Sequence, residues 1–290
     1  MKNRSLKGAF GLATVTVLAF GAVSAMAETP PKKAELVVNE DTKLVTETTP
    51  KEGISNLEKA YDGWRFRSSE TQAVQADDFD NPGMIFVDQA LDQWNAVDGT
   101  EGKSCASCHG TPEESMKGVR ASYPKWDDSM GKVATIEMEI NNCRTNRMGA
   151  EAWKYTGGKM TAMNALITLQ SRGMPVDVAI DGKAKPTWEH GKEMYYTRTG
   201  QLELSCASCH EQHYGDRIRA EILSQGQING FPAYRLKNGK LNSIHARFKG
   251  CVRDTRAETY KPGSDDFVAL ELYVASRGNG LSVTGPSVRN

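Results

Sequence analysis

Two copies of one short motif carry the most specific chemistry in this 290-residue chain. The sequence Ser-Cys-Ala-Ser-Cys-His occupies residues 104–109 and recurs unchanged at residues 205–210. Cys-x-x-Cys-His attaches haem covalently, because two cysteines one helical turn apart can add to the vinyl groups while the histidine ligates iron. The attachment cysteines would be Cys105, Cys108, Cys206 and Cys209, and the proximal iron ligands would be His109 and His210.

Two other classes of site use Cys-x-x-Cys pairs. A thioredoxin-type redox pair does not need a histidine after both copies. A zinc site needs two partner pairs close together, and these pairs lie about a hundred residues apart. The sequence therefore predicts two covalently bound haem c groups.

Two cysteines remain, Cys143 and Cys251, and each follows its haem motif by a few dozen residues. A haem iron that only transfers electrons usually takes a sixth protein ligand, most often Met or His. No methionine follows Cys206, so the second site has His213, His245 and Cys251 as candidates, and His213 lies too close to His210 to reach the opposite face. The candidates of the first site are Cys143 and several methionines, namely Met130, Met138, Met148 and Met160.

A disulfide between Cys143 and Cys251 is the alternative, since exported proteins form disulfides readily. Both cysteines occupy the same place in the repeat, and a bridge would require equivalent positions of the two halves to face each other. This argument favours thiolate ligation at both irons. A thiolate lowers the potential of iron, which suits sulfur chemistry better than routine electron carriage.

A basic segment surrounds Cys251. Residues 235–256 hold seven Lys and Arg residues and one acid, in a chain whose formal net charge is zero. Arg247 stands four residues before Cys251, so in a helix the two side chains share a face. Arg247 could bind an oxyanion there and lower the thiol pKa, or it could neutralise haem propionates. The zero net charge gives no indication of binding to nucleic acid or to a membrane surface.

Around these motifs the chain reads as a duplicated, mainly α protein. Ser-Arg-Gly at 171–173 recurs at 276–278, in the same order as the other landmarks. Each half has an amphipathic helix before the haem motif and another at its end; the first of these should begin at Asn81-Pro82 and bury Met84, Val87, Leu91 and Trp94 on one face. A short hairpin is expected around Asn238-Gly239, and residues 175–186 should link the halves.

Four segments follow from this pattern. Residues 1–27 have a basic start, an apolar run and an Ala-x-Ala end, which is typical of a cleaved signal peptide and predicts a periplasmic location with no membrane span. Residues 28–75 are polar and form an N-terminal extension, which is either an arm against a partner or a partly disordered leader. Two tandem cytochrome c-like domains then occupy residues 76–178 and 179–290.

Two Cys-x-x-Cys-His motifs, one lone cysteine per half, and Arg-Phe-Lys-Gly-Cys at 247–251 resemble the dihaem SoxA family, the subunit of SoxAX L-cysteine S-thiosulfotransferases. The resemblance covers essentially the whole chain after the signal peptide. It implies that His109 and Cys143 ligate haem 1, and that His210 and Cys251 ligate haem 2, the active site. Cys251 would be found wholly or partly as a persulfide, and Arg247 would bind thiosulfate.

The resemblance also implies partners and a reaction. A monohaem SoxX-like subunit would form a heterodimer with this chain, and the SoxYZ carrier protein would supply the accepting cysteine on SoxY. Thiosulfate would be joined oxidatively to that cysteine, and the two electrons would pass to a soluble cytochrome c. The rival functions are a dihaem electron carrier without its own chemistry and a dihaem peroxidase, which needs a displaceable distal ligand.

Overall fold

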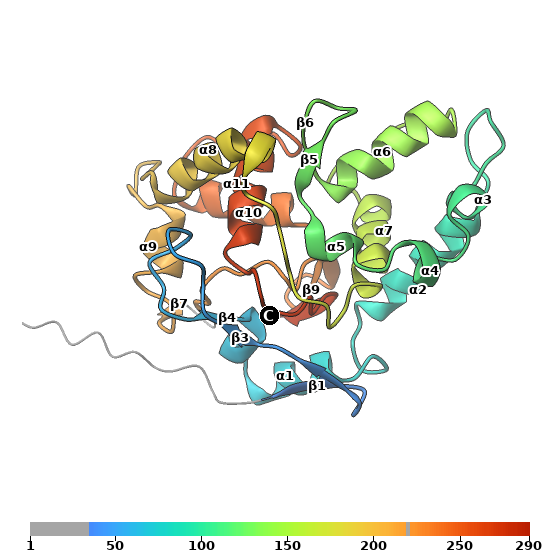
Figure 1. The fold of residues 1–290 in the computed structure, drawn as a ribbon. Coiled ribbons are helices and arrows are strands. Elements are labelled where there is room, and N and C mark those ends of the chain that lie inside the picture. Colours follow the sequence, from blue (N-terminus) through green and yellow to red (C-terminus); the bar gives the residue numbers. More distant parts are fainter. Residues whose placement is uncertain (1–34, 219–220) are drawn as a thin grey trace, which may run out of the picture.

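The structure is a computed structural model that describes residues 35–218 and 221–290. Figure 1 shows that it is built mainly of short helices, with short strands between them. The predicted signal peptide lies outside the described residues. The α-helices are α1 Ser69–Ala76, α2 Met84–Asn95, α3 Cys105–His109, α4 Pro112–Ser115, α5 Val119–Ser122, α6 Ile136–Arg147, α7 Gly158–Leu169, α8 Lys185–Tyr196, α9 Cys206–His210, α10 Ile244–Asp254 and α11 Asp265–Ser276. Two short 3-10 helices are η1 Gly63–Phe66 and η2 Gly182–Ala184.

The strands are two or three residues long and form small pairs. They are β1 Leu36–Val38, β2 Thr42–Leu44, β3 Glu47–Thr48, β4 Ala60–Tyr61, β5 Lys125–Asp127, β6 Lys132–Ala134, β7 Arg217–Ile218, β8 Glu221–Ile222, β9 Ala233–Arg235, β10 Lys240–Asn242 and β11 Ser287–Arg289. The three-stranded sheet has the order β10-β9-β11, with β9 antiparallel to β10 and parallel to β11. The β9–β10 pair confirms the hairpin predicted at Asn238-Gly239.

Each half repeats one helical plan. A first helix (α2 or α8), the haem-motif helix (α3 or α9), the helix with the lone cysteine (α6 or α10) and a closing helix (α7 or α11) follow in the same order. One apolar core is built on α7 of the first half; the other is built on α11 of the second half and also includes Ala121 and Val133 of the first. The predicted fold class, mainly α with two tandem cytochrome c-like domains, is thus observed, while the domain limits at 76, 178 and 290 stay predictions.

The first and closing helices of each half pack directly together. In the second half, Gly191 of α8 lies so close to α11 that an added Cβ would overlap the Ala269 carbonyl. Ala90 of α2, at the equivalent place in the first half, is fully buried against α7. Small side chains at this crossing let each helix pair approach closely, which fixes the frame that holds the haem motif.

The described part of the N-terminal extension packs onto its own chain. Leu36, Val38, Leu44 and Trp64 form a small apolar core. Backbone groups of this segment also bond the second half: Val45 N donates to Ser282 Oγ at 2.9 Å. The alternative of a partly disordered leader is therefore wrong for residues 35–75, because polar composition does not reveal these long-range hydrogen bonds; contact of this segment with a partner stays a prediction.

Two local expectations differ from the structure. The helix predicted from Asn81-Pro82 begins at Met84, because the Asn81 side chain accepts a hydrogen bond from Gly83 N at 2.9 Å and caps a turn instead. Leu91 is 38% exposed, and the buried face of α2 consists of Val87, Ala90 and Trp94. The linker at 175–186 is a packed segment, in which Val176 and Val178 are buried.

Candidate functional site

The repeated motif folds identically in both halves because its serines form a capping box. Ser107 N donates to Ser104 Oγ at 3.2 Å, and Ser104 N donates back to Ser107 Oγ at 2.9 Å. Residues 205 and 208 form the same pair of bonds, both at 3.1 Å. Each box starts a helix at the first motif cysteine, so the second cysteine and the histidine follow at i+3 and i+4 on the same helical face.

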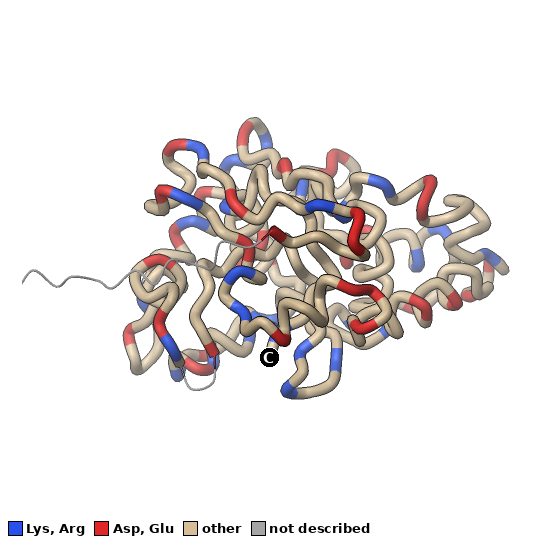
Figure 2. Tube along the Cα trace, turned by 90° about the horizontal axis from the view of Figure 1, so that it is seen from below, with Lys and Arg blue, Asp and Glu red and all other residues tan. Residues whose placement is uncertain are grey.

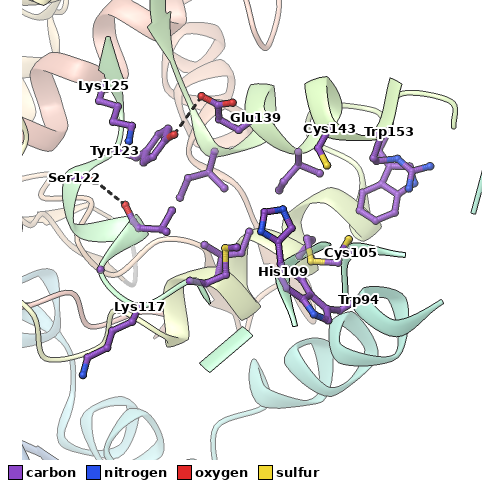
Figure 3. Close-up of a pocket in the computed structure, with 18 of the residues that line it drawn as sticks. Trp94, Cys105, His109, Lys117, Ser122, Tyr123, Lys125, Glu139, Cys143 and Trp153 are labelled. Carbon is purple, nitrogen blue, oxygen red and sulfur yellow. Dashed lines mark hydrogen bonds between the residues drawn. The ribbon is translucent and has the colours of Figure 1, made fainter. Parts of the chain in front are cut away.

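The first motif opens into a cavity of about 420 Å³ with a largely apolar lining. Cys105, His109 and Cys143 line it together, and the His109 ring points into it toward α6, which carries Cys143 (Figure 3). Trp94 supports the histidine from below, with ring centroids 5.8 Å apart. Two sulfur atoms and an imidazole thus surround an apolar space, which is the donor set and the surrounding that a covalently attached haem needs.

In the second motif the histidine is fixed more firmly. His210 Nδ1 lies 2.7 Å from the Ser224 carbonyl oxygen. A carbonyl only accepts, so Nδ1 carries the proton and Nε2 keeps its lone pair for a metal. Burial lowers the pKa of His210 to about 4, which keeps the ring neutral. This is the second-shell hydrogen bond expected of a histidine that ligates iron.

Each lone cysteine lies beside the motif of its own half. Burial raises the pKa of the Cys105 thiol, and nearby Cys143 adds to the rise. Burial raises the pKa of Cys206 to about 12, and nearby Cys251 adds to that rise. Cys143 and Cys251 both belong to the described residues and form no disulfide with each other.

Arg247 and Cys251 lie on one helix, as the spacing predicted. Both belong to α10, four residues apart, and therefore share a face. Burial raises the pKa of Cys209, while the Arg247 charge opposes that rise, so the guanidinium lies within electrostatic range of the second motif. Elsewhere acidic and basic residues are interspersed along the trace (Figure 2), and on α10 itself Arg253 pairs with the adjacent Asp254.

The other residues predicted as candidate distal ligands mostly lie away from the haem motifs. His245 is fully buried; its Nδ1 accepts from Gly263 N at 2.9 Å, and its Nε2 lies 3.0 Å from Glu271 Oε2. His213 is an exposed partner of Asp216. Both histidines are engaged away from the second motif. In the first half, Cys143 and Met148 both line the cavity, whereas Met130, Met138 and Met160 do not.

Sequence reasoning missed several residues around the motifs. Arg144, next to Cys143, stacks on Trp153 at 4.0 Å and bonds Asp98 at the first site. At the second site, the buried Arg277 pairs with Glu211, the residue directly after the proximal histidine, and its charge acts on His210. The only signal for Arg277 was the repeated Ser-Arg-Gly, which identified the duplication but not the destination of the arginine.

A duplicated helical frame, a capped Cys-x-x-Cys-His helix in each half, and a preset histidine beside a lone cysteine define a c-type cytochrome. The family model described as the cytochrome c domain of SoxA/TsdA matches residues 89–176 and 190–283, once in each half. The chain belongs to this SoxA/TsdA cytochrome c family, and haem c is therefore its cofactor.

Similar proteins agree with this assignment. The "L-cysteine S-thiosulfotransferase subunit SoxA" of Rhodovulum sulfidophilum is 56% identical, covering 96% of this chain and 98% of that protein. The protein of the same name from Paracoccus pantotrophus is 55% identical, covering 96% and 97%. A crystal structure of SoxXA from P. pantotrophus superimposes with a TM-score of 0.87 and 56% identity, covering 90% of this chain and all of that one.

These findings confirm the predicted SoxA family, and the predicted enzyme class agrees with the names of the relatives. Within residues 35–218 and 221–290, no helix combines the length and the apolar character needed to cross a membrane.

Proposed function

We propose that this chain is the dihaem catalytic subunit of a periplasmic L-cysteine S-thiosulfotransferase, which joins thiosulfate to a cysteine of a SoxY-like carrier protein. One observation carries the proposal: Arg247 and Cys251 share a face of α10, beside a second Cys-x-x-Cys-His motif whose histidine is neutral and preset. The relatives named for this activity support it across almost the full length of the chain.

The residues divide into two cofactor sites. One haem would be attached by Cys105 and Cys108 and ligated by His109 and Cys143. The other would be attached by Cys206 and Cys209 and ligated by His210 and Cys251. Sulfur atoms and one imidazole lie together in each half, and each lone cysteine is close to its own motif.

At the second site Arg247 would hold the substrate. A guanidinium binds the oxygens of a sulfonate through two parallel hydrogen bonds, and Cβ atoms at i and i+4 of a helix are about 5–6 Å apart. A thiosulfate held by Arg247 can therefore direct its terminal sulfur toward Cys251. Arg247 is exposed and Cys251 is half-buried, so both a small anion and a protruding cysteine of a carrier protein could reach them.

The reaction forms one sulfur–sulfur bond. The terminal sulfur of thiosulfate joins the carrier cysteine, the thiol proton goes to solvent, and two electrons leave to an external acceptor, for which we propose a soluble cytochrome c. A haem held by Cys206, Cys209 and His210 would supply an iron that accepts electrons one at a time. Cys251 sulfur would first bond to the terminal sulfur of thiosulfate as its proton and the two electrons leave, and the carrier thiolate would then attack that terminal sulfur and release Cys251, while Arg247 stabilises the negative charge.

Two further elements complete the proposal. A monohaem SoxX-like subunit would bind this chain, in keeping with the superimposing crystal structure, which is described as SoxXA. Residues 1–27 would direct export and then be removed, leaving Glu28 as the first residue. The intact mass of the mature chain would then contain two haem additions, and some molecules would carry an additional sulfur atom on Cys251.

The central test uses matched variants of the assembled complex. Cys251→Ala should abolish thiosulfate-dependent reduction of cytochrome c, while Cys143→Ala, its counterpart in the repeat, should retain turnover. Arg247→Gln should raise the KM for thiosulfate, and Arg253→Gln on the same helix should not. Unchanged turnover in Cys251→Ala would leave the chain an electron carrier, and rapid turnover of hydrogen peroxide would favour a peroxidase.

A further inference from the structure

A buried arginine lies behind the second haem motif. Arg277 follows α11 directly and is 1% exposed. Its Nη1 donates to the Gln225 carbonyl at 3.0 Å, its Nη2 donates to Glu211 at 3.1 Å, and its guanidinium lies 4.4 Å from the centre of the Tyr195 ring. Burying a cation costs several kcal/mol unless partners compensate for the lost water, so these contacts fix Arg277 tightly.

The two hydrogen-bond partners of Arg277 lie next in sequence to the proximal histidine or to the residues that contact it. Glu211 is the residue directly after His210. Gln225 sits between Ser224, whose carbonyl accepts from His210 Nδ1 at 2.7 Å, and Gly226, whose backbone packs on the His210 ring. Arg277 thus joins the end of the motif helix to the loop that orients the imidazole.

The N-terminal extension closes this cluster from outside. Tyr61 N donates to Gln225 Oε1 at 2.7 Å, and Gln225 Nε2 donates to the Lys59 carbonyl at 3.1 Å. Asn56 Nδ2 donates to Glu211 at 3.2 Å. Glu211 also accepts from the Tyr196 hydroxyl at 3.0 Å and 3.1 Å.

The side-chain partners of the Glu211 carboxylate all donate to it, and its Oε1 forms an ion pair with Nη2 of Arg277 at 3.1 Å. The proximal side of the second site thus holds one buried positive charge and one negative charge at fixed places.

The first half has no such cluster. Gly110 stands directly after His109, in the place that Glu211 takes in the second half. Arg172, the counterpart of Arg277 in the repeat, donates instead to both carboxylate oxygens of Asp78 at 2.8 Å. Among the described residues, the His109 side chain makes no hydrogen bond, unlike that of His210. The Arg277–Glu211 pair therefore occurs at the second of the two duplicated sites and has no counterpart at the first.

We infer that Arg277 is a positioning residue for the proximal ligand of the second site, and that the Arg277–Glu211 pair sets the reduction potential of the haem there and not of the other. The inference rests on the proposed second haem. A buried cation stabilises the more electron-rich ferrous state, and a buried anion stabilises the ferric state, because low polarity leaves these charges weakly screened. The same pair holds the loop whose Ser224 carbonyl engages Nδ1 of His210, so that Nε2 would be available to ligate iron.

Spectroscopic redox titration of the mature holoprotein tests this directly. Arg277→Met should lower the potential of the second haem by at least a tenfold change in its ferric-to-ferrous equilibrium constant, which is about 59 mV for a one-electron couple. Glu211→Gln should shift the same potential upward. Arg172→Met, the matched control, should leave the second haem unchanged.

Opposite signs at one haem distinguish a charge effect from loosening, which would move both variants in the same direction. Shifts of equal sign, or no shift in either variant, would overturn the inference. Arg277→Lys keeps the charge but loses the paired hydrogen bonds, so it should alter the low-spin ferric EPR signal of the second haem more than its potential. If Arg277→Met does not fold, Arg277→Lys and Glu211→Gln together still test the inference. A mature chain whose mass contains a single haem would refute the proposed function instead.

Discussion

Replacing Gly226 by alanine should perturb the second site at one defined contact, the one with the His210 ring. The φ of Gly226 is +75°, and a Cβ placed on it would lie 2.8 Å from Cγ and 3.0 Å from Nδ1 of His210. Real Cβ atoms do not approach other atoms this closely, so in Gly226→Ala the imidazole must move. The variant should therefore disturb both the backbone of this loop and the bond from His210 to the Ser224 carbonyl.

Gly131 separates these two effects. Its φ is +64°, and an added Cβ would meet nothing within 4 Å. An alanine in the left-handed region costs about 1–2 kcal/mol at either position. Each kcal/mol moves the Tm of a chain of this size by roughly 2–4 °C, so backbone strain alone should lower the Tm of each variant by roughly 2–8 °C.

The assay combines thermal unfolding with ferric EPR of the holoprotein. Gly226→Ala should lose more Tm than Gly131→Ala and should change the low-spin signal of the second haem while the first is unaltered. Gly131→Ala should change neither signal. Equal losses of Tm with an unaltered second signal would show that the contact between Gly226 and His210 does not hold the ligand in place.

Three other predictions concern stability. Burial and the charge of nearby Glu271 raise the pKa of Glu137 above 4.5, so the folded state retains this proton to higher pH than the unfolded state. The stability that this proton contributes is lost as pH rises through the raised pKa. Glu137→Gln should therefore show a flatter dependence of Tm on pH than the unmodified protein. Ser104→Ala and Ser205→Ala each remove a helix cap and should each cost about 1 kcal/mol in denaturant unfolding, and a cost near zero in either would contradict the capping boxes. Asp62 is fully buried and accepts from Trp64 N and Thr284 Oγ1, so Asp62→Ala should cost about 3 kcal/mol or more, whereas a loss below about 1 kcal/mol would show that it does not tie the N-terminal extension to the second half.

The chemistry of the motifs could be predicted from the sequence because it is local. Cys-x-x-Cys-His and its serine caps span six residues, so their spacing determines their geometry once a helix forms. Arg247 and Cys251 are likewise related by one helical turn. The Asn-Gly hairpin followed from turn chemistry alone.

The contacts that the sequence did not reveal are long-range. Arg277 meets Glu211 across 66 residues, and Tyr61 meets Gln225 across 164. Neither the composition of residues 28–75 nor the Ser-Arg-Gly repeat indicates which distant groups these residues will bond. The start of α2 shows the same limit on a smaller scale, since Asn81 caps the turn before the helix and not the helix itself.

One further polar contact occupies the same place in both halves but is made by different residue types. Glu137 and His245 are each the second residue of the helix that carries a lone cysteine. In the first half, Glu137 accepts from Asn164 of the closing helix at 2.8 Å; in the second, His245 lies 3.0 Å from Glu271 of the equivalent helix. A polar pair therefore anchors the cysteine-bearing helix to the closing helix in both halves.

These two anchors also influence each other. The Glu271 charge raises the pKa of Glu137, and the His245 ring stacks on Tyr155 of the first half at 4.8 Å. Because such charges are weakly screened in a buried setting, a change at Glu271 acts on α6 as well as on α10. The helix that carries Cys251 is thus held by a cluster to which both halves contribute, so the first domain belongs to the framework of the second site whether or not its own haem takes part in the chemistry.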